Sequence, residues 1–390
     1  MAPGKRIGLI YVYNENWIGG TYYIQNLVAA LNHLPEARKP ELIIISSEEK
    51  NVEDLKKVTG YYHLSYRRFD HKSNPLRSYV NKISRKISGN DIILERHSDI
   101  DIIFPISNGL HISLFSNLKF PIFWIPDFQE YFMPDFFNEV EMNARRDFQR
   151  YVLEKAGYIV FSSESAKADF NHMYPGNKVR QYLLPFAVSH PPGVQTDAKG
   201  MAKKYNIPGN YFICSNQFWK HKNHEVILRA IGSLKKRGIE VHMVFTGKEF
   251  DHRFPHYFEE LKKLSADLEI TENIRFLGFI ERSDQVSLMK GSIAVIQPSL
   301  FEGWSTVVED SKAIDANLIV SDIAVHREQL QNYTHKTFFL PHLEEELADA
   351  INTVLNDKGG NRNLGAYCYE NDIKNFANAF MNIMDGLTHD

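Results

Sequence analysis

The chain has 390 residues, of which 43% are hydrophobic and 24% are charged, and its formal net charge at pH 7 is −3. This length predicts two domains rather than one, and the composition is typical of a globular protein that buries two cores. The lack of a basic excess argues against a dedicated nucleic-acid-binding protein, so no nucleic acid is expected among the partners.

Cysteine content and hydropathy indicate the compartment. The two cysteines, Cys214 and Cys368, have apolar or aromatic neighbours in the sequence. A disulfide remains open from the sequence alone, but we expect two buried free thiols in a reducing compartment. No run of about 18 apolar residues occurs, so no membrane-spanning helix is expected. We therefore expect a cytoplasmic protein, and peripheral contact with the inner face of the membrane stays an open alternative.

In the first half of the chain, short apolar segments alternate with helical patterns. Apolar strands that are continuous rather than alternating predict a parallel sheet covered on both faces. The expected strands are residues 6–13, 41–46, 91–94, 100–106, 120–125 and 158–162. A helix is expected over residues 21–34, after a polar loop that contains Gly19 and Gly20.

A proline-rich stretch near the middle of the chain interrupts this pattern, which then restarts as a second doubly wound domain. The expected strands there are residues 211–215, 241–246, 274–277, 293–297, 318–321 and 336–340, and the expected helices are residues 224–237, 257–268, 283–290, 306–316 and 343–356. The predicted boundaries are 1–188 for the N-terminal domain, 189–200 for a linker, 201–365 for the C-terminal domain and 366–390 for a final segment. That final segment contains an expected helix, over residues 369–384, that could dock on either domain, with the N-terminal domain as the candidate.

The strongest chemical signal follows the expected strand 293–297. Glu302 and Gly303 lie in the next loop, and a helix is expected to begin near Thr306. Thr306 and Glu309 have the spacing of a capping box, which predicts a helix N-terminus whose amides face a ligand. A glycine at position 303 lets the backbone approach that ligand closely. The residues predicted to bind a diphosphate here are Gly303, Trp304, Ser305 and Thr306.

The stretch from about Phe276 to Gln329 resembles the retaining glycosyltransferases of family 4, which have the GT-B fold. The resemblance rests on Gly278, on Pro298-Ser299-Leu300-Phe301-Glu302-Gly303 and on the run from Leu318 to Asp322. Those enzymes carry an E-x7-E motif, in which the first carboxylate lies by the donor sugar and the second binds the ribose hydroxyls. The resemblance implies an α/β fold of two doubly wound Rossmann-like domains that face a central cleft.

In this chain the motif reads E-x7-D. The resemblance therefore implies that Glu302 orients the donor sugar and that Asp310 binds the ribose. Glu309 competes for the ribose role, although we interpret it as the capping partner of Thr306. Asp310 reaches about one methylene less far than the usual glutamate. The position where the family usually has a glycine is Asp315.

A second signal lies in the loop after the first strand of the second half. The family places an arginine and a lysine, five residues apart, against the donor diphosphate in this loop; Lys222 matches the lysine, and Gln217 stands at the arginine position. Loss of the arginine removes a bidentate phosphate partner, which Lys220 could replace. A merely solvated basic loop is the alternative. Gly247 and Ile280, each just after a later strand, complete the predicted donor site.

Histidines in and near this loop suggest a metal site as an alternative hypothesis. They are His221, His224, His252 and His256. No cysteine or carboxylate pattern completes a zinc site around them. We therefore expect no metal and no other cofactor.

Three weaker signals lie in the first half. Gly19 and Gly20 match the family's glycine loop and do not form the G-x-G-x-x-G fingerprint of dinucleotide-binding proteins. Asp127 stands near a family histidine that contacts the donor sugar, and a hydroxyl-binding role and a turn role are equally open. Residues 67–86 contain seven Lys or Arg and one Asp. This basic stretch predicts contact with an anionic membrane or a lipid diphosphate acceptor, or else a solvated helix face.

The resemblance implies transfer of a glycosyl group, a hexose in our expectation, from a nucleoside diphosphate sugar to a glycan or lipid-linked acceptor during polysaccharide or cell-surface glycan synthesis. Glu302, Lys222 and Asp127 are the candidate catalytic residues. The leaving diphosphate can itself help to deprotonate the acceptor, so stabilising its charge is the main catalytic effect. Two alternatives stay open: a sugar-nucleotide epimerase with the GT-B fold, and a degenerate protein that binds without catalysis.

Overall fold

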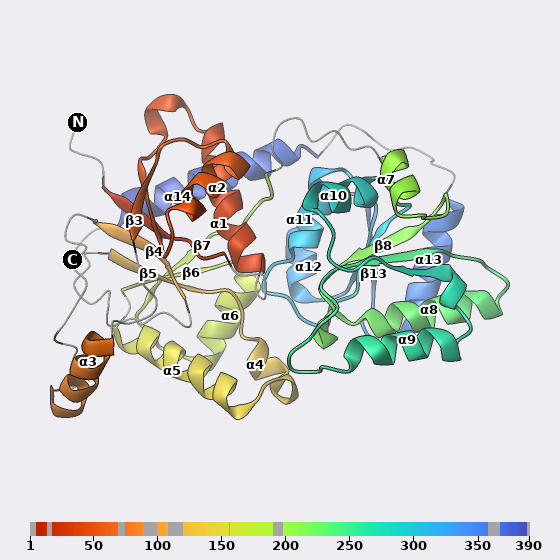
Figure 1. Ribbon diagram of the computed structural model, residues 1–390, viewed down its shortest axis with the longest axis horizontal. Helices are drawn as coiled ribbons and strands as arrows, with labels where there is room; N and C mark the ends of the chain where they lie inside the picture. The colour runs from red at the N-terminus through yellow and green to blue at the C-terminus, as the bar shows by residue number, and fades with distance from the viewer. Residues whose placement is uncertain are drawn as a thin grey trace. The chain divides into compact units, whose positions relative to one another are not determined.

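The protein consists of two units, each built around one sheet, as Figure 1 shows in a computed structural model. The first unit comprises Met1–Pro191 and Asn371–Asp390, and the second comprises Pro192–Glu370. The structure describes residues 5–13, 18–68, 75–88, 92, 100–107, 120–155, 157–189, 198–357 and 367–387. The boundary between the units falls inside the linker expected over residues 189–200.

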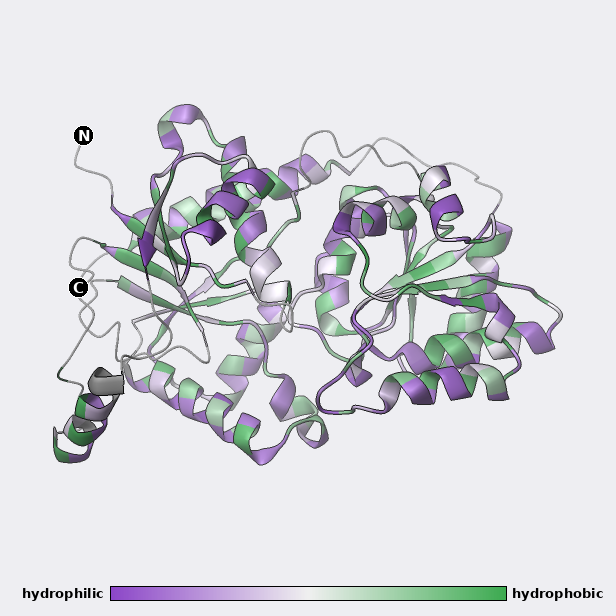
Figure 2. Cartoon of the chain, viewed as in Figure 1, coloured by the Kyte–Doolittle hydropathy of each residue, from purple (hydrophilic) through white to green (hydrophobic). Residues whose placement is uncertain are grey.

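The first unit contains a seven-stranded parallel sheet with the order β3-β2-β1-β4-β5-β6-β7. Its strands are β1 (Ile7–Ile10), β2 (Leu42–Ser46), β3 (Leu64–Arg68), β4 (Ile102–Ile106), β5 (Phe120–Ile125), β6 (Tyr158–Phe161) and β7 (Arg180–Leu183). The inner strands are hydrophobic because helices cover both faces, whereas the edge strand β3 is hydrophilic (Figure 2). A charged edge of this kind disfavours pairing with another chain.

The helices of the first unit are α1 (Ile18–Ala30), α2 (Lys50–Thr59), α3 (Pro75–Ser88), α4 (Gln129–Phe132), α5 (Glu139–Lys155), α6 (Glu164–Met173) and α14 (Tyr369–Gly386). On one face of the sheet, α5 and α6 bury Phe148 and Phe170 in a core that also contains Phe123 and Phe161. Short 3-10 turns cover Leu31–His33, Glu36–Arg38 and Pro134–Phe136.

The C-terminal helix α14 packs on the first unit. Phe376 lies 6.0 Å from the ring of Tyr23 on α1, and Phe380 lies 6.1 Å from Phe104 on β4 (ring centroids). Lys5 Nζ donates hydrogen bonds to three carbonyl oxygens at the end of this helix, those of Met384, Asp385 and Leu387, at 2.9, 3.1 and 2.6 Å. A cation at a helix C-terminus stabilises the helix because the carbonyl groups there have no partner within the helix.

The second unit contains a six-stranded parallel sheet with the order β10-β9-β8-β11-β12-β13. Its strands are β8 (Phe212–Ser215), β9 (Met243–Thr246), β10 (Ile274–Phe276), β11 (Val295–Gln297), β12 (Leu318–Ser321) and β13 (Lys336–Phe339). Its helices are α7 (Ala198–Lys204), α8 (His224–Lys236), α9 (Tyr257–Asp267), α10 (Arg282–Gly291), α11 (Thr306–Ala313), α12 (Ala324–Gln329) and α13 (Glu344–Asn356), with 3-10 turns η6 (Lys220–Lys222) and η7 (Thr271–Asn273).

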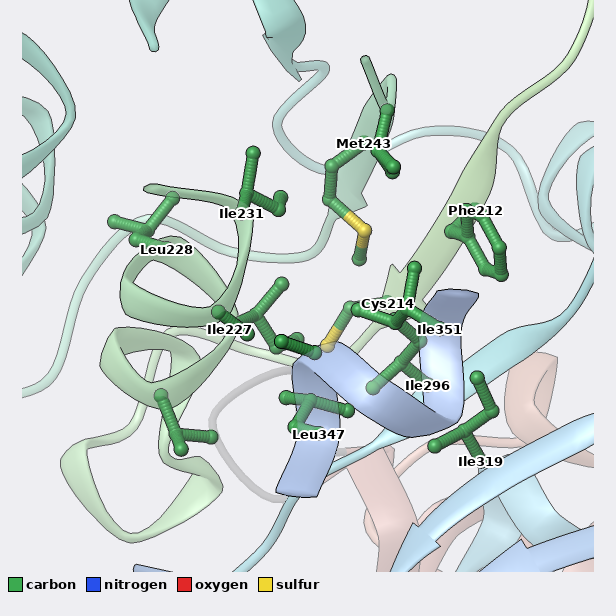
Figure 3. Packing of buried hydrophobic residues seen from close by; sticks show 14 of the residues in the cluster. Phe212, Cys214, Ile227, Leu228, Ile231, Met243, Ile296, Ile319, Leu347 and Ile351 are labelled. Atoms are coloured by element: carbon green, nitrogen blue, oxygen red, sulfur yellow. The ribbon is translucent and has the colours of Figure 1, made fainter. Parts of the chain in front are cut away.

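Successive residues of these strands supply two cores, one on each face of the sheet. Cys214 and Met243 point into the core under α8, α9 and α13, which Figure 3 shows from close by. Their neighbours Ile213 and Val244 point into the other core, under α10 and α11. Because both faces are buried, the strands read as continuous apolar runs rather than alternating ones.

The predicted α/β fold of two doubly wound domains is confirmed, while the central cleft stays a prediction. The strand expected at residues 91–94 lies outside the described residues apart from Ile92. Both cysteines are free; Cys214 is buried, which raises the pKa of its thiol to about 12, whereas Cys368 is exposed, so the expectation of two buried thiols is wrong for Cys368. Among the helices in the described ranges, none has the length and hydropathy needed to cross a bilayer.

Candidate functional site

Two loops meet where the strand order of the second sheet reverses. β8 and β11 are neighbours at this point, and the loops after them carry Lys222 and Glu302. Lys222 Nζ donates to Glu302 Oε1 at 2.5 Å, and the two side chains are only 19% and 8% exposed. Doubly wound sheets bind ligands beyond the carboxyl ends of their strands at this kind of position. The structure thus brings together two residues that were predicted from separate motifs.

Backbone contacts hold these two loops together. The amide of Leu300 donates to the carbonyl oxygen of His221 at 2.8 Å. Asn223 has a φ of 57°, in the left-handed region that asparagine tolerates better than most residues. Its Nδ2 donates to the carbonyl oxygens of Pro298 and Pro341, at 3.2 and 2.8 Å. The relative position of Lys222 and Glu302 is therefore fixed by the main chain as well as by their ion pair.

The N-terminus of α11 is capped differently from the prediction. Ser305, not Thr306, is the N-cap, and its Oγ accepts from the amide of Val308 at 3.4 Å. The amide of Ser305 itself donates to Gln329 Oε1 at 2.9 Å. The predicted capping box of Thr306 with Glu309 is therefore wrong. Neither Ser305 Oγ nor Gln329 Oε1 accepts from the amides of Thr306 and Val307 in the first turn. These two amides suit an anion because the helix dipole adds to their partial positive charge.

The carboxylate of Glu309 is buried in a network of its own, with 1% of the residue exposed. It accepts two hydrogen bonds from Lys312 Nζ at 3.0 Å, one from Gln329 Nε2 at 3.0 Å and one from the hydroxyl of Tyr369 at 3.1 Å. These three side chains make four hydrogen bonds with the carboxylate, while the choice between Glu309 and Asp310 for the ribose stays untested. Glu309 is thus a structural anchor for α11.

Asp310, the second carboxylate of the E-x7-D motif, is completely buried and forms an ion pair with Arg282 at the start of α10. Arg282 Nη1 also donates to Gln285 Oε1 at 2.8 Å. The next predicted family position, Asp315, has a φ of 54°, which is the left-handed conformation that favours a glycine.

In the loop after β8, the diphosphate roles expected for Gln217 and Lys220 stay predictions, and both side chains contact neighbouring aromatic residues. Trp219 Nε1 donates to Gln217 Oε1 at 2.9 Å, and Lys220 Nζ lies 4.5 Å from the ring centroid of Phe254. Gly247 follows β9 and has a φ of 143°; a Cβ added there would lie 2.0 Å from the carbonyl oxygen of Asn216. This close approach accounts for the glycine without a ligand, so the ligand role of Gly247 stays a prediction.

The remaining predicted donor-site residues of the second unit lie in the loops after β10 and β11. Ile280 follows β10 and packs on the core that contains Val307 and Val308 of α11. Gly303 and Trp304 lie between Glu302 and the N-cap of α11 and are partly exposed. Ile280 therefore packs on the same core as the first turn of α11, and Gly303 and Trp304 precede that turn in the chain.

The structure gives two of the histidines near the loop other packing partners, and the absence of a metal stays a prediction. His224 is fully buried and stacks on Phe218, with ring centroids 4.5 Å apart, and burial lowers its pKa to about 3. His252 lies against the ring of Trp219. The described residues contain no group of three or more metal-binding side chains.

The predicted residues of the first unit are described separately, because they belong to another sheet. Gly19 and Gly20 lie in the first turn of α1 rather than in the preceding loop, so the helix begins earlier than predicted. Asp127 follows β5, and its Oδ1 accepts from the amide of Gln129 at 3.1 Å and from Arg145 Nη1 at 3.3 Å. The turn role of Asp127 is therefore present, and its hydroxyl-binding role stays a prediction.

Three side chains of the second-unit site were missed from the sequence. Gln297 Nε2 donates to Glu302 Oε1 at 2.8 Å, and Arg282 pairs with Asp310. His326 Nδ1 lies 2.9 Å from the carbonyl oxygen of Ser321; burial lowers its pKa, and Nε2 has no hydrogen-bond partner among the described residues. A polar residue that ends an apolar strand, as Gln297 does, is a signal that the sequence offered.

The second unit is similar in sequence to known proteins. Residues 199–371 match the family described as Glycosyl transferases group 1. The putative glycosyltransferase EpsF of Bacillus subtilis is 25% identical over 173 residues, which are 43% of this chain and 40% of EpsF. The O-antigen chain mannosyltransferase RfbU of Salmonella typhimurium is 28% identical over 123 residues, 32% of this chain and 33% of RfbU. The matched stretches therefore span less than half of either relative.

A solved structure of similar fold extends over both units. The crystal structure of Anabaena HepE in complex with UDP and glucose has a TM-score of 0.65 and 13% sequence identity, with 97% of this chain and 95% of HepE covered. At this identity the likeness shows the fold alone. The sequence matches therefore support a group 1 glycosyl transferase domain over residues 199–371, and the structural match supports the two-domain GT-B-type fold of the chain.

Proposed function

We propose that the protein is a retaining glycosyltransferase that transfers a hexose from a nucleoside diphosphate sugar to a glycan or lipid-linked acceptor. The observation that carries the proposal is the Lys222–Glu302 pair, which lies next to the N-terminus of α11 at the switch point of the second sheet. Lysine and helix amides suit a diphosphate, and a carboxylate suits sugar hydroxyls. The names of two relatives, a glycosyltransferase and a mannosyltransferase, support the same reaction class.

The proposed reaction needs no strong enzymic base. The acceptor hydroxyl oxygen bonds to the anomeric carbon on the face from which the diphosphate leaves, and the bond between that carbon and the diphosphate oxygen breaks. The hydroxyl proton passes to the leaving diphosphate. Lys222 and the amides of Thr306 and Val307 stabilise the charge that develops on the diphosphate, so the reaction is proposed to proceed without a metal ion.

Binding of nucleotides and consumption of sugar nucleotides test the proposal. We expect UDP, GDP or ADP to bind in a calorimetric titration, and the matching sugar nucleotide to be hydrolysed slowly in the absence of an acceptor. Conversion of the sugar nucleotide to an isomer, with no release of nucleoside diphosphate, would favour an epimerase instead. Binding without any turnover would favour a non-catalytic protein, and no binding at all would refute the proposal.

We also propose that helix α3 contacts an anionic membrane surface that holds a lipid-linked acceptor. On this helix apolar side chains are exposed and two polar ones are buried. Tyr79, Ile83 and Ile87, spaced four residues apart, are 65%, 43% and 81% exposed. Asn81 and Ser84 are the buried polar residues. The sequence from 71 to 90 contains no acidic residue and several basic ones. An exposed apolar stripe beside lysine side chains is typical of helices that lie in the membrane interface.

Sedimentation with lipid vesicles tests this contact. We expect binding to vesicles that contain phosphatidylglycerol, little binding to vesicles of phosphatidylcholine alone, and loss of binding in the double variant Ile83→Glu, Ile87→Glu. Val140→Glu is the matched control, because Val140 is a 79% exposed apolar residue on α5 of the same unit. Equal binding of the double variant and the control variant would exclude α3 as the contact.

A further inference from the structure

Glu302 receives two hydrogen bonds on the same oxygen, and only one of the donors is charged. Lys222 Nζ and Gln297 Nε2 both donate to Oε1, at 2.5 and 2.8 Å. In the described part of the chain, no side chain or amide donates to Oε2. A carboxylate accepts through both oxygens, so Oε2 is the atom that remains for a ligand hydroxyl.

The amide of Gln297 is held in one orientation by its surroundings. Gln297 is fully buried at the end of β11, and its Oε1 accepts from Asn216 Nδ2 at 2.7 Å. Asn216 Nδ2 can only donate, so Oε1 of Gln297 faces Asn216 and Nε2 faces Glu302. Nε2 also donates to Ser299 Oγ at 3.0 Å. Reversing the amide would turn its carbonyl oxygen toward a carboxylate and leave buried groups without partners.

Lys222 has two tasks if a nucleoside diphosphate binds. Its ammonium group has three hydrogens, one of which is used by Glu302, and 19% of the side chain is exposed. A diphosphate beside Lys222 competes with Glu302 for this cation. Gln297 is neutral, buried and anchored by Asn216, so its hydrogen bond to Glu302 does not depend on the ligand.

We propose that Gln297 is a positioning residue, which holds Oε1 of Glu302 so that Oε2 stays aimed at a hydroxyl of the donor sugar while Lys222 engages the leaving diphosphate. This inference rests on the proposed function. It separates two roles in the site, because Lys222 acts on the diphosphate and Gln297 acts on the sugar through Glu302. Removal of Gln297 should therefore slow the reaction more than it weakens nucleotide binding.

Gln297→Met tests the separation, because methionine has a similar volume and cannot donate a hydrogen bond. The sugar nucleotide that the wild-type protein consumes, from a panel that includes UDP-glucose and GDP-mannose, is the probe, together with its nucleoside diphosphate. We expect the turnover number to fall by about 10- to 100-fold, because small misplacements of a catalytic group cost this much, while the Kd for the nucleoside diphosphate changes by less than about threefold. Lys222→Ala is expected to weaken nucleotide binding as well.

Two controls separate positioning from a loss of stability. Tyr211→Phe removes a buried hydrogen bond of 2.8 Å, from the hydroxyl of Tyr211 to the carbonyl oxygen of Leu288, in the same unit, and should leave the turnover number unchanged. Gln297→Glu keeps the shape of the side chain but places a carboxyl group beside Glu302, and two such groups share one proton. The turnover of Gln297→Glu should therefore fall toward high pH relative to the wild type.

The charged group beside Glu302 is Lys222 on η6. The buried titratable groups nearby are His326 on α12 and Cys214 on β8. Burial lowers the pKa of His326 and raises that of Cys214 to about 12, so both are uncharged at neutral pH. The double variant Gln297→Glu, Glu302→Gln should lose the new pH dependence, because one carboxyl group remains.

The outcomes distinguish this inference from the proposed function. Full turnover of Gln297→Met in an active protein, or equal losses in turnover and in nucleotide affinity, would overturn the positioning role and leave the glycosyltransferase proposal standing. A wild-type protein that binds no nucleotide would overturn both.

Discussion

Arg282 and Asp310 form an ion pair in which the carboxylate is completely buried and 30% of the arginine side chain is exposed. The more accessible partner is the cation. A ribose contact by Asp310, as the family resemblance implies, therefore requires Arg282 to move or to make the contact itself. The side chain of Asp310 is one methylene shorter than that of a glutamate, and its carboxylate is buried in the second unit.

We predict that Arg282→Met destabilises the second unit by about 3 kcal/mol, because it leaves the buried Asp310 carboxylate without its cation. Urea denaturation followed by circular dichroism measures the change. Lys204→Met is the matched control: Lys204 is 53% exposed, and its partner Asp284 keeps the hydrogen bond from the hydroxyl of Tyr205. The control should lose much less stability because its ion pair is exposed to solvent, and equal losses would contradict the importance of burial at Asp310.

For the site itself, we predict that Lys222→Ala and Glu302→Ala each abolish glycosyl transfer while the protein stays folded. Lys222→Ala should also weaken nucleotide binding, because it removes a cation at the diphosphate, whereas Glu302→Ala should not. Steady-state assays and calorimetric titrations measure the two effects. Near-normal turnover of either variant would refute the site assignment.

The second unit should lose stability in mild acid because His224 is buried in its core. Burial lowers the pKa of His224 to about 3, from an ordinary value of 6.5. Between these two values the unfolded chain binds a proton that the folded protein does not, so stability is complete above about pH 6.5 and falls as the pH decreases. The slope should be about 1.4 kcal/mol per pH unit.

Thermal melts between pH 7 and pH 4.5 measure this slope in the wild type and in His224→Phe, which keeps an aromatic ring against Phe218. The variant should show a smaller decrease on acidification. His256→Asn serves as the control, because His256 is exposed in the folded protein. A wild-type slope that survives in His224→Phe would assign the acid sensitivity to other groups.

The C-terminal helix should contribute strongly to the stability of the first unit. Phe380 is completely buried in contact with Phe104. Phe380→Ala is expected to cost about 3 to 5 kcal/mol through lost burial and the cavity left behind. Tyr62→Ala, at a 74% exposed aromatic residue of the same unit, should cost far less in the same denaturation experiment.

Sequence patterns alone were sufficient to predict the strands that are buried on both faces of a sheet. The strand containing Ile293 to Gln297 is a continuous apolar run because helices cover the sheet on each side, so periodicity and length identified it. The edge strands β3 and β7 were missed because they are half exposed and contain Arg67, Arg68 and Arg180, which do not resemble a buried strand.

Sequence motifs predicted individual residues of the site but not the contacts between them. Lys222 and Glu302 were predicted from separate motifs. Their contact depends on the pairing of β8 with β11, which the local sequence does not indicate. The contacts of Glu309 with Gln329 and Tyr369 join residues 20 and 60 positions apart, so local spacing suggested a capping box instead. Long-range side-chain networks of this kind have no signature in local sequence.

The most direct test of the account is calorimetric titration of the wild-type protein and of Lys222→Ala with UDP, GDP and ADP. We predict that one of these nucleotides binds the wild type with a Kd in the micromolar to millimolar range and binds Lys222→Ala at least about tenfold more weakly. Absence of binding by all three nucleotides, or equal affinity of both proteins for the nucleotide that binds, would contradict a diphosphate site at Lys222 and Glu302.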